Sequence, residues 1–525
     1  MNSEVRLRRF QAQVWSEPII MEMSHEGERG IMVPQADEHI QAAVGEAESY
    51  IPAAMLRKEP PKLPELSQPH VLRHYERLSQ QNLGMEQNID LGEGTCTMKY
   101  SPKVNESIVR TPQVTAIHPC QDKDTIQGIL EIMYKLDLFL REISGMDQFS
   151  LQPRGGSYAT YANACLVRAY HASRGELKQR NEMITSIFSH PCNAATAAAA
   201  GYKVITLMPD ESGYPDIEAL RAVCSPHTAG LMITNPEDTG IYNPRIREFV
   251  DTVHKAGGLC FYDQANANGI LGITRAREAG FDACHFNLHK TFSSPHGSSG
   301  PGGGAFGVRE ELAKFLPVPV VAFDGTKYYL DYDRPSSIGK VSEFYGNVGV
   351  DVRSYAWIMC MGAEGLLEAA RVSVINNNYL SQLLMAIPGV VRWYAEGKYR
   401  LEQTRFSWEK LKEDTGCGTD DVRRRMMDYG LQAYFASHHP WVVPEPFTPE
   451  PCETYSKEDC EYWAAVLKQI SHEAYTNPEI VKSAPHNSVI HQIDTEPLDD
   501  PRKWAMTWRA YLRKAQTNAE SDGEV

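Results

Sequence analysis

Residues 281–308 read FDACHFNLHKTFSSPHGSSGPGGGAFGV, an apolar run that ends in His-Lys and continues into a loop of glycine, serine and proline. The single lysine of this stretch, Lys290, follows the apolar run almost directly. Burying an unpaired ammonium group costs several kcal/mol or forces the group to lose its proton, so a core strand gains nothing from it. A lysine in this position is typical of a protein that bonds a cofactor covalently through the lysine amine.

Short apolar runs recur along the chain up to this stretch, and helical patterns separate several of them. The runs are MITSIF, KVITLM, AGLMITN, GLCFYD and ACHFNL, at residues 183–188, 203–208, 229–235, 258–263 and 283–288. Helical patterns lie between them at 214–224 and 243–257. Strands that alternate with helices predict a mostly parallel sheet covered on both faces. Ligands of such sheets bind beyond the carboxyl ends of the strands.

Composition changes along the chain predict its domains. The first hundred residues are rich in proline and charge, as in LRKEPPKLPELSQPH, and residues 354–386 have the pattern of a long connecting helix. The last residues, TNAESDGEV, are polar and acidic, which is typical of disorder. We predict an N-terminal arm at 1–95, a large cofactor-binding domain at 96–350, a smaller C-terminal α+β domain at 351–515 and a disordered tail at 516–525.

The overall composition disfavours several classes of protein. The net charge of -15 argues against a nucleic-acid partner. The 11 cysteines form no CxxC pair and no tight cluster with histidine, so the sequence predicts neither a metal centre nor a disulfide framework. No apolar run approaches the ~20 residues of a membrane helix, and the first residues lack the apolar core of a secretory signal. We therefore expect a cytoplasmic protein without a membrane segment.

Polar residues at the strand ends form one pattern. Asp263 closes one run, Lys290 lies 290 − 263 = 27 residues later, and Gly155, Gly156 and Ser157 open a helix after the segment FSLQP. This order and spacing predict an α/β protein of pyridoxal phosphate fold type I, aspartate aminotransferase-like, with a large mostly parallel-sheet domain and a smaller C-terminal α+β domain. The cofactor expected is pyridoxal phosphate.

Each residue of the pattern has a chemical reason. Lys290 can bond to the cofactor aldehyde, and Asp263 can keep the pyridine nitrogen protonated so that the ring accepts electrons. The glycine turn offers backbone N–H groups to the phosphate at a helix N-terminus. His190 lies where such folds stack a ring on the cofactor. Two further cofactor contacts are expected at Asn235 and Thr291.

Taken singly, these features have commoner structural explanations. A lone aspartate at a strand end usually caps a turn or a helix, and a lone histidine such as His190 usually satisfies a structural hydrogen bond. A glycine turn alone is weak evidence. The prediction therefore depends on their order along one alternating pattern.

Longer stretches resemble one family. FNLHKTFSSPHGSSGPGGGAFGV is similar to the lysine motif of glycine decarboxylase P-proteins, the pyridoxal phosphate component of the glycine cleavage system, and four other stretches also resemble that family. They are SEPIIMEMSHEGERGIMVP, GTCTMKYSPKVNE, SIGKVSEFYGNVGVDVRSYAWI and TPEPCETYSKEDCEYW, at 16–34, 94–106, 337–358 and 448–463. The chain resembles the catalytic half made as a separate subunit, subunit 2.

The resemblance implies an activity and partners. Glycine, or another small amino acid, displaces Lys290 and loses CO2, and the aminomethyl group passes to the lipoyl group of H-protein beside a P-protein subunit 1. A homodimer or heterotetramer is expected. The glycine-rich loop at 293–304 is a candidate channel for the lipoyl arm, or a flexible surface loop. The substrate contacts expected are Thr95, Cys96, Thr97, Tyr158, Gln264 and His289.

Four positions depart from the family motifs. Thr160 replaces a glutamate, Cys192 a threonine, Gln264 a glycine and Glu402 a histidine. Changed buried polar contacts can alter substrate discrimination by ~10^4. The alternative is therefore a divergent paralogue that performs another pyridoxal phosphate reaction on an amino acid without H-protein, such as decarboxylation, aldol-type cleavage or condensation.

Two features keep two explanations each. The segment SEFYGNVG at 342–349 fits a contribution across a subunit interface or a plain loop between domains. The pair His438 and His439 fits surface histidines, the commoner explanation, or an approach to the substrate from the small domain.

Overall fold

The computed structural model describes residues 5–84, 86–89, 91–93, 99–297, 300, 302–432, 434, 437–501 and 504–522. The chain forms two compact units. The first unit comprises Met1–Arg8 and Gly84–Ser483, and the second comprises Arg9–Leu83 and Ala484–Val525. The chain thus passes from one unit to the other after residues 8, 83 and 483, and the predicted bounds of the arm at 95 and of the small domain at 515 stay predictions. The predicted division at residue 350 falls inside the first unit and stays a prediction.

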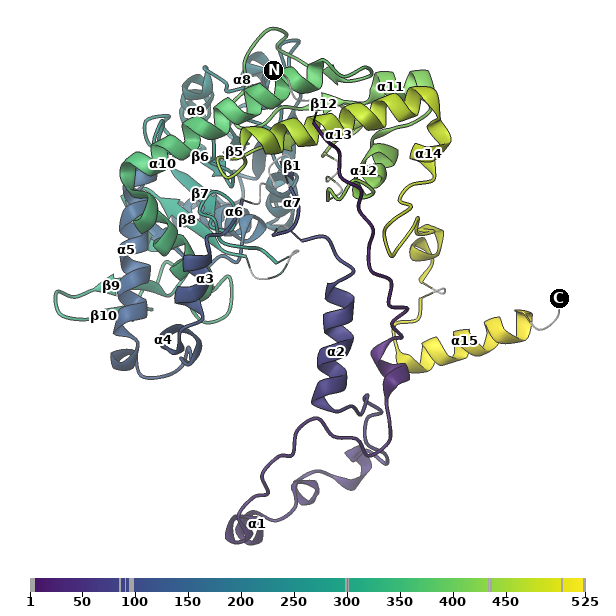
Figure 1. Cartoon of the computed structure of the whole chain (residues 1–525). Coiled ribbons are helices and arrows are strands. Elements are labelled where there is room, and N and C mark those ends of the chain that lie inside the picture. Colours follow the sequence, from purple (N-terminus) through teal and green to yellow (C-terminus); the bar gives the residue numbers. More distant parts are fainter. Residues whose placement is uncertain are drawn as a thin grey trace. The chain divides into compact units, whose positions relative to one another are not determined.

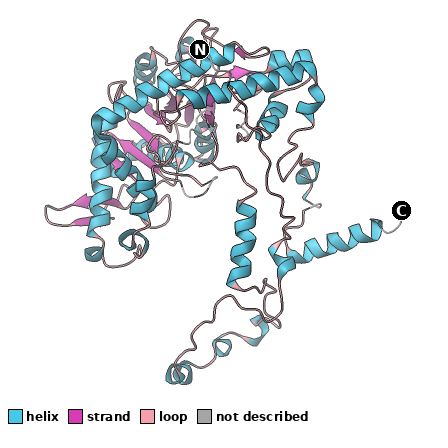
Figure 2. Cartoon of the chain, in the orientation of Figure 1, coloured by secondary structure: helices cyan, strands magenta, loops and turns pink. Residues whose placement is uncertain are grey.

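A seven-stranded sheet lies at the centre of the first unit, surrounded by helices (Figure 2). Its strands follow the order β2-β8-β7-β6-β5-β3-β4. All neighbours from β4 to β7 pair in parallel, and β8 is antiparallel to both of its neighbours. This confirms the predicted mostly parallel sheet. The strands are β2 (Gln148–Ser150), β3 (Glu182–Ser186), β4 (Lys203–Leu207), β5 (Thr228–Thr234), β6 (Leu259–Gln264), β7 (Ala283–Asn287) and β8 (Gly304–Val308).

Both faces of the sheet are buried, as the apolar runs predict. Alternate residues of one strand enter different cores: Phe261 of β6 joins the core that contains Ala162, whereas Tyr262 joins the core that contains Leu130. Helices supply the rest of these cores. They are α5 (Gln127–Ser144), α6 (Gly156–Ser173), α7 (Cys192–Ala199), α8 (Ile217–Val223) and α9 (Ile246–Lys255).

Helix α10 (Val348–Met385) leads from these cores into a separate C-terminal core, and it packs against α5 and α13 (Figure 1). At Gly362 its backbone leaves helical geometry, with φ 63°, a value that favours glycine. The C-terminal core gathers Trp408, Phe447 and Trp463. Around it lie β11 (Val391–Arg392), β12 (Phe406–Ser407), β13 (Pro446–Phe447), α11 (Glu409–Thr415), α12 (Thr419–Met427), α13 (Lys457–Thr476) and α14 (Pro478–Lys482).

Smaller elements complete the first unit. They are β1 (Gly92–Glu93), which pairs with β14 (Pro449–Glu450), the hairpin β9 (Val320–Phe323) and β10 (Tyr328–Asp331), the helices α3 (Lys103–Val109) and α4 (Pro112–Thr115), and the 3-10 helices η4 (Lys123–Thr125) and η5 (Glu310–Phe315). Among the described residues, no helix has the length and apolar character needed to cross a membrane.

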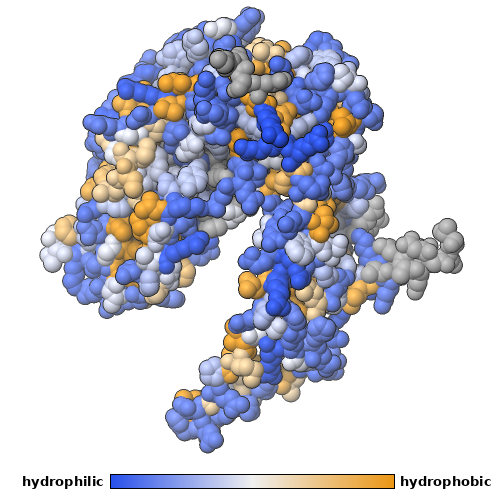
Figure 3. Space-filling model, viewed as in Figure 1, coloured by the Kyte–Doolittle hydropathy of each residue, from blue (hydrophilic) through white to orange (hydrophobic). Residues whose placement is uncertain are grey.

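The second unit buries few side chains. Its two chain segments meet at a backbone hydrogen bond from Ala12 N to Asn487 O, 2.9 Å long. Apolar side chains such as Ile31, Met32 and Val33 are more than 70% exposed, and Figure 3 shows apolar patches on its surface. Its elements are η1 (Ile20–Met23), α1 (Glu38–Val44), η2 (Ala47–Tyr50), η3 (Ala53–Met55), α2 (Gln68–Ser79), η6 (Glu496–Asp499) and α15 (Trp508–Asp522).

The predicted disordered tail at 516–525 overlaps the end of α15 and stays a prediction. Residues 516–522 form the end of α15, where we expected no regular structure. Alanine, glutamine and glutamate in this segment have high helix propensity, and the polar and acidic composition of the last residues concealed it.

Candidate active site

Asp263 lies at the carboxyl end of β6, where only 2% of the residue is exposed. Its Oδ2 accepts a hydrogen bond from Asn193 Nδ2 at 2.7 Å, and its Oδ1 accepts one from the backbone N of Ala265 at 3.0 Å. Burial acts to raise the pKa of Asp263, but His285 and the Asn193 hydrogen bond outweigh it, so the pKa lies below its usual value. Asp263 is therefore a buried carboxylate.

Lys290 lies in the turn directly after β7, the neighbouring parallel strand, and is 6% exposed. Its backbone N donates to Asn287 O at 3.1 Å, which fixes the turn. The charge of Lys290 is among the causes that lower the pKa of His190, His289 and His285. These three imidazoles therefore lie near the Lys290 side chain.

The N-terminus of α6 lies at the same strand ends, and the glycines there leave its backbone exposed to the site. Gly155 precedes α6 with φ 146°, a conformation that side chains other than glycine rarely adopt. A Cβ on Gly156 would lie 3.0 Å from Asn287 Nδ2 and 3.5 Å from His285 Nε2. Glycine at both positions brings the free N–H groups of the helix beside β7, an arrangement that suits a phosphate group. Ser157 follows in the first turn of α6.

His190 follows β3 and is partly buried. Burial and the charge of Lys290 lower its pKa to about 4, although Asp263 acts in the opposite direction. The His190 ring is therefore neutral near pH 7. Its ring meets the His438 ring edge to face, with the ring centroids 5.0 Å apart and an interplanar angle of 81°.

Two of the expected cofactor contacts already hold backbone groups. The Asn235 amide donates to Asn243 O at 3.3 Å and accepts from Asn243 N at 2.8 Å, so it braces the loop after β5. Thr291 Oγ1 accepts from the backbone N of Ala267 at 2.9 Å. Their contacts with a cofactor stay predictions.

The expected substrate residues are spread over different surfaces. His289 is buried beside Lys290, with its Nδ1 3.0 Å from Gly303 O, and Tyr158 is 47% exposed on α6. Strand alternation points Gln264 away from the face of Asp263, because the register pairs Asp263 with His285 and Gln264 with Phe286. Thr95, Cys96 and Thr97 lie outside the described residues.

The sequence reasoning missed His285. Its Nε2 lies 3.5 Å from Asp263 Oδ1, its ring stacks parallel to Phe261, and neither ring nitrogen has a hydrogen-bond partner among the described residues. Period-two alternation was the available signal: in ACHFN it places His285 and Asn287 on one face of the strand.

Two of the departing positions lie together at the site. The thiol of Cys192, at the start of α7, has its pKa raised to about 12 by burial and by Asp263, while the hydroxyls of Thr160 and Ser157 act to lower it. Glu402 is buried elsewhere: its Oε2 lies 2.2 Å from the Cβ position of Gly269, and burial raises its pKa to about 7. Substitutions at Cys192 and Thr160 therefore change the surroundings of Asp263.

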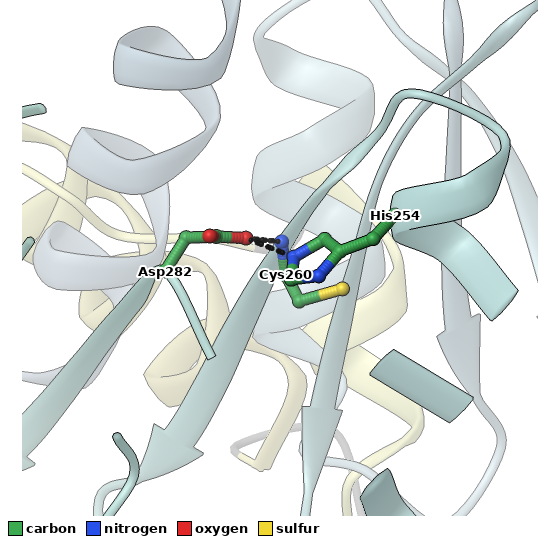
Figure 4. Close-up of side chains that lie close together, drawn as sticks. All are labelled: His254, Cys260 and Asp282. Carbon is green, nitrogen blue, oxygen red and sulfur yellow. Dashed lines mark hydrogen bonds and ion pairs between the residues drawn. The ribbon is translucent and has the colours of Figure 1, made fainter. Parts of the chain in front are cut away.

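His254, Cys260 and Asp282 lie together as potential metal ligands (Figure 4). They are at the ends of β6 and β7 opposite to Asp263 and Lys290. Asp282 Oδ2 accepts from His254 Nε2 and from the backbone N of Cys260, both at 2.7 Å. The Cys260 thiol donates to Val250 O at 3.8 Å. Hydrogen bonds within the fold thus account for the cluster.

Two family models match the chain: the glycine dehydrogenase C-terminal domain over residues 369–492 and the class-V aminotransferases over residues 157–319. A "Probable glycine dehydrogenase (decarboxylating) subunit 2" of Pyrococcus abyssi is 46% identical over 502 residues, which are 95% of this chain and 97% of the relative. A relative of the same name from Caldanaerobacter subterraneus is 43% identical over 483 residues, 91% of this chain and 96% of the relative.

Solved structures agree on the fold. A glycine decarboxylase (P-protein) of the glycine cleavage system, in inhibitor-bound form, superposes with a TM-score of 0.71 at 19% identity and covers 84% of this chain and 99% of its own. A sphingosine-1-phosphate lyase of Burkholderia pseudomallei superposes with a TM-score of 0.58 at 15% identity, over 81% of this chain and 96% of its own. The predicted fold type I is therefore confirmed.

Proposed function

The chain belongs to the family of glycine dehydrogenase (decarboxylating) subunit 2, and from this membership we propose that it decarboxylates glycine with pyridoxal phosphate bound at Lys290. It is an enzyme of that type. The observation that carries the proposed site is the pairing of a buried lysine and a buried, hydrogen-bonded carboxylate at the ends of adjacent parallel strands.

The residues present fit pyridoxal phosphate. A Cβ on Gly156 would fill the space beside Asn287, and buried polar atoms of His285 and Asn287 face that space without a hydrogen-bond partner among the described residues. When bound, this cofactor supplies an aldehyde for a lysine and an aromatic ring that accepts the electron pair left by decarboxylation.

Each side chain has one task in the proposal. The Gly155–Gly156 turn and the first N–H groups of α6 bind the phosphate. Lys290 would bond to the cofactor aldehyde through its amine. Asp263 would face the ring nitrogen and keep it protonated, because Asn193 and Ala265 keep the carboxylate in position and charged. His190, whose ring is neutral near pH 7, would contact the cofactor ring.

The later steps of the proposed reaction are taken from the reaction of the family. We propose that the aminomethyl group left after loss of CO2 is passed to the lipoyl disulfide of an H-protein, that reduction of the disulfide takes up the electrons, and that a subunit 1 completes the assembly. The glycine-rich loop that begins at Ser293 is the proposed approach of the lipoyl arm. Thr95, Cys96 and Thr97 stay proposed substrate contacts.

Isotope exchange tests this function. The chain, loaded with pyridoxal phosphate and mixed with lipoylated H-protein and a candidate subunit 1, should incorporate labelled bicarbonate into the carboxyl group of glycine. Lys290→Ala should abolish both the exchange and the cofactor absorbance while the fold persists. An unchanged absorbance in the variant would refute Lys290 as the anchor.

A second candidate rests on Cys192, near Asp263, and on Thr160 beside Cys192, two positions where the family motifs have other residues. In this case a divergent enzyme performs another pyridoxal phosphate reaction on an amino acid without H-protein. A chain that is fully loaded with cofactor but exchanges no bicarbonate, and whose absorbance responds to an amino acid other than glycine, would favour it.

A further inference from the structure

A buried arginine lies outside the contacts proposed for the cofactor. Arg405 immediately precedes β12 and is 1% exposed. Its Nη2 donates to Asp238 Oδ2 at 2.6 Å and to the backbone O of His438 at 2.8 Å. Since desolvation largely offsets the attraction within a buried ion pair, stability alone does not explain this arrangement.

The segment that carries Arg405 is fastened to the loop after β5. Leu401 N donates to Gly240 O, and Gln403 Nε2 donates to Glu237 O, both at 2.9 Å. A Cβ on Gly240 would lie 1.8 Å from Gln403 O, and its φ of 77° also favours glycine. The two segments are therefore in direct backbone contact.

The same loop holds the residues that lead to His190. Asp238 N donates to Phe188 O at 3.4 Å, and the Arg405 guanidinium lies over the Phe188 ring, 5.5 Å from its centroid. Ser189 Oγ donates to Glu237 Oε1 at 3.4 Å. His190 is the next residue, so its backbone position depends on the contacts of Arg405 and Asp238.

His438 connects Arg405 directly to the His190 ring. Its backbone is bonded to Arg405, and its ring meets the His190 ring at 5.0 Å. Burial and then the charge of Arg405 lower the pKa of His438 to about 4. Both rings are therefore neutral near pH 7, and no charge repulsion opposes their edge-to-face contact.

We propose that His438 is a positioning residue of the cofactor site, whose ring holds the His190 ring in place while the Arg405–Asp238 pair fixes His438. The inference rests on the proposed function, because that function assigns His190 to the face of the cofactor. His438 transfers no proton in this role. An aromatic ring without nitrogen should therefore be able to take the place of the imidazole.

The first test leaves the buried pair intact. His438→Ala removes the ring, His438→Phe keeps a ring, and His439→Asn is the matched control, since asparagine tolerates the positive φ of 56° at that position. One readout is the rate at which diethyl pyrocarbonate modifies His190 in the cofactor-free chain, followed by mass spectrometry. The other is the dissociation constant of pyridoxal phosphate, followed by absorbance.

His438→Ala should speed the modification of His190 and weaken pyridoxal phosphate binding about fivefold, because an aromatic pair contributes about 1 kcal/mol. His438→Phe and His439→Asn should stay near the wild type in both measurements. Arg405→Met combined with Asp238→Asn removes both charges together. It should weaken binding in the same direction, and adding His438→Ala should cause little further loss, because the residues act through one path.

Unchanged His190 reactivity and an unchanged dissociation constant in His438→Ala would overturn the inference. Equal losses in His438→Phe and His438→Ala would also overturn it, because the role would then require the imidazole nitrogens. A wild-type chain that binds no pyridoxal phosphate would refute the proposed function instead. The reactivity of His190 in the cofactor-free chain would still decide whether His438 covers it.

Discussion

Two buried aspartates follow neighbouring strands of the sheet, Asp263 at the end of β6 and Asp238 in the loop after β5, and their surroundings give them opposite properties. Asp263 accepts hydrogen bonds on both oxygens, and its pKa lies below the usual value. Asp238 binds Arg405 through Oδ2, while its Oδ1 has no hydrogen-bond partner among the described residues, and burial raises its pKa to about 6. Both are almost fully buried, so His285 and the hydrogen bonds of Asp263, rather than burial, account for the lower pKa of Asp263.

The two carboxylates therefore have different roles. The hydrogen bonds of Asp263 keep it ionised in a place where a cofactor can use the charge. Asp238 connects two segments of the chain, and its neighbour Glu237 has a pKa raised to about 8 by burial, so the loop carries a proton at neutral pH. Loss of charge should therefore impair chemistry at Asp263 and stability at Asp238.

The largest effect is expected from Asp263→Asn. The amide keeps an acceptor for Ala265 but loses the charge, so bicarbonate exchange should fall by ~10^2 to 10^3, the loss typical of removing one preorganised electrostatic group. The urea midpoint should barely change. A large fall in the midpoint with little loss of exchange would reverse the roles assigned to the two aspartates.

Asp238→Asn should show the opposite pattern. It leaves the Arg405 guanidinium buried without a charge partner, so the free energy of unfolding should fall by about 3 kcal/mol. Urea denaturation measures this fall. Asp147→Asn, which removes a more exposed ion pair with Arg277, is the matched control and should lower stability by less than about 1 kcal/mol. Equal losses in the two variants would contradict the comparison.

Glu237→Gln should change how stability depends on pH. The folded chain keeps the Glu237 proton up to about pH 8, whereas the unfolded chain releases it near the ordinary glutamate pKa of 4.5, so this group lowers stability as pH rises through that window. The variant should therefore lose about 2 kcal/mol less than the wild type between about pH 6.5 and pH 8. Urea denaturation across this range checks it, and parallel curves would show that Glu237 does not hold the proton.

The smallest effect is expected from Cys192→Thr, which restores the family residue beside Asp263. Bicarbonate exchange with glycine should rise by up to about tenfold, and stability should change by less than about 1 kcal/mol. Cys192→Ser is the control for loss of the thiol without the added methyl group. A fall in exchange with both Thr and Ser would show that the site has adapted to the thiol.

Local patterns in the sequence predicted the sheet and the polar residues at the ends of its strands. Lys290, Asp263 and the Gly155–Gly156 turn each lie in a short stretch whose periodicity or glycine content indicates a strand end, so their convergence follows from the parallel fold. His285 was open to the same reasoning, since alternation along β7 places it opposite Asp263.

The sequence did not predict contacts between segments that are far apart along the chain. Arg405 and Asp238 are 167 residues apart, and nothing in either stretch indicates the other. For the same reason the sequence left two explanations for His438, a surface residue or an approach to the substrate from the small domain. The helical segment at 516–522 was not predicted, because the polar and acidic composition there is typical of disorder.

The change of direction at Gly362 in α10 has a thermodynamic consequence. The 38-residue segment, two helical stretches joined at Gly362, contributes Trp357 and Leu366 to the core at the sheet, and Leu380 and Leu384 to the C-terminal core. Unfolding either core removes the partner surface of that helix, so the two should melt in a single cooperative transition despite having separate interiors. A side chain at 362 would strain the left-handed backbone there and lower the cooperativity of that transition.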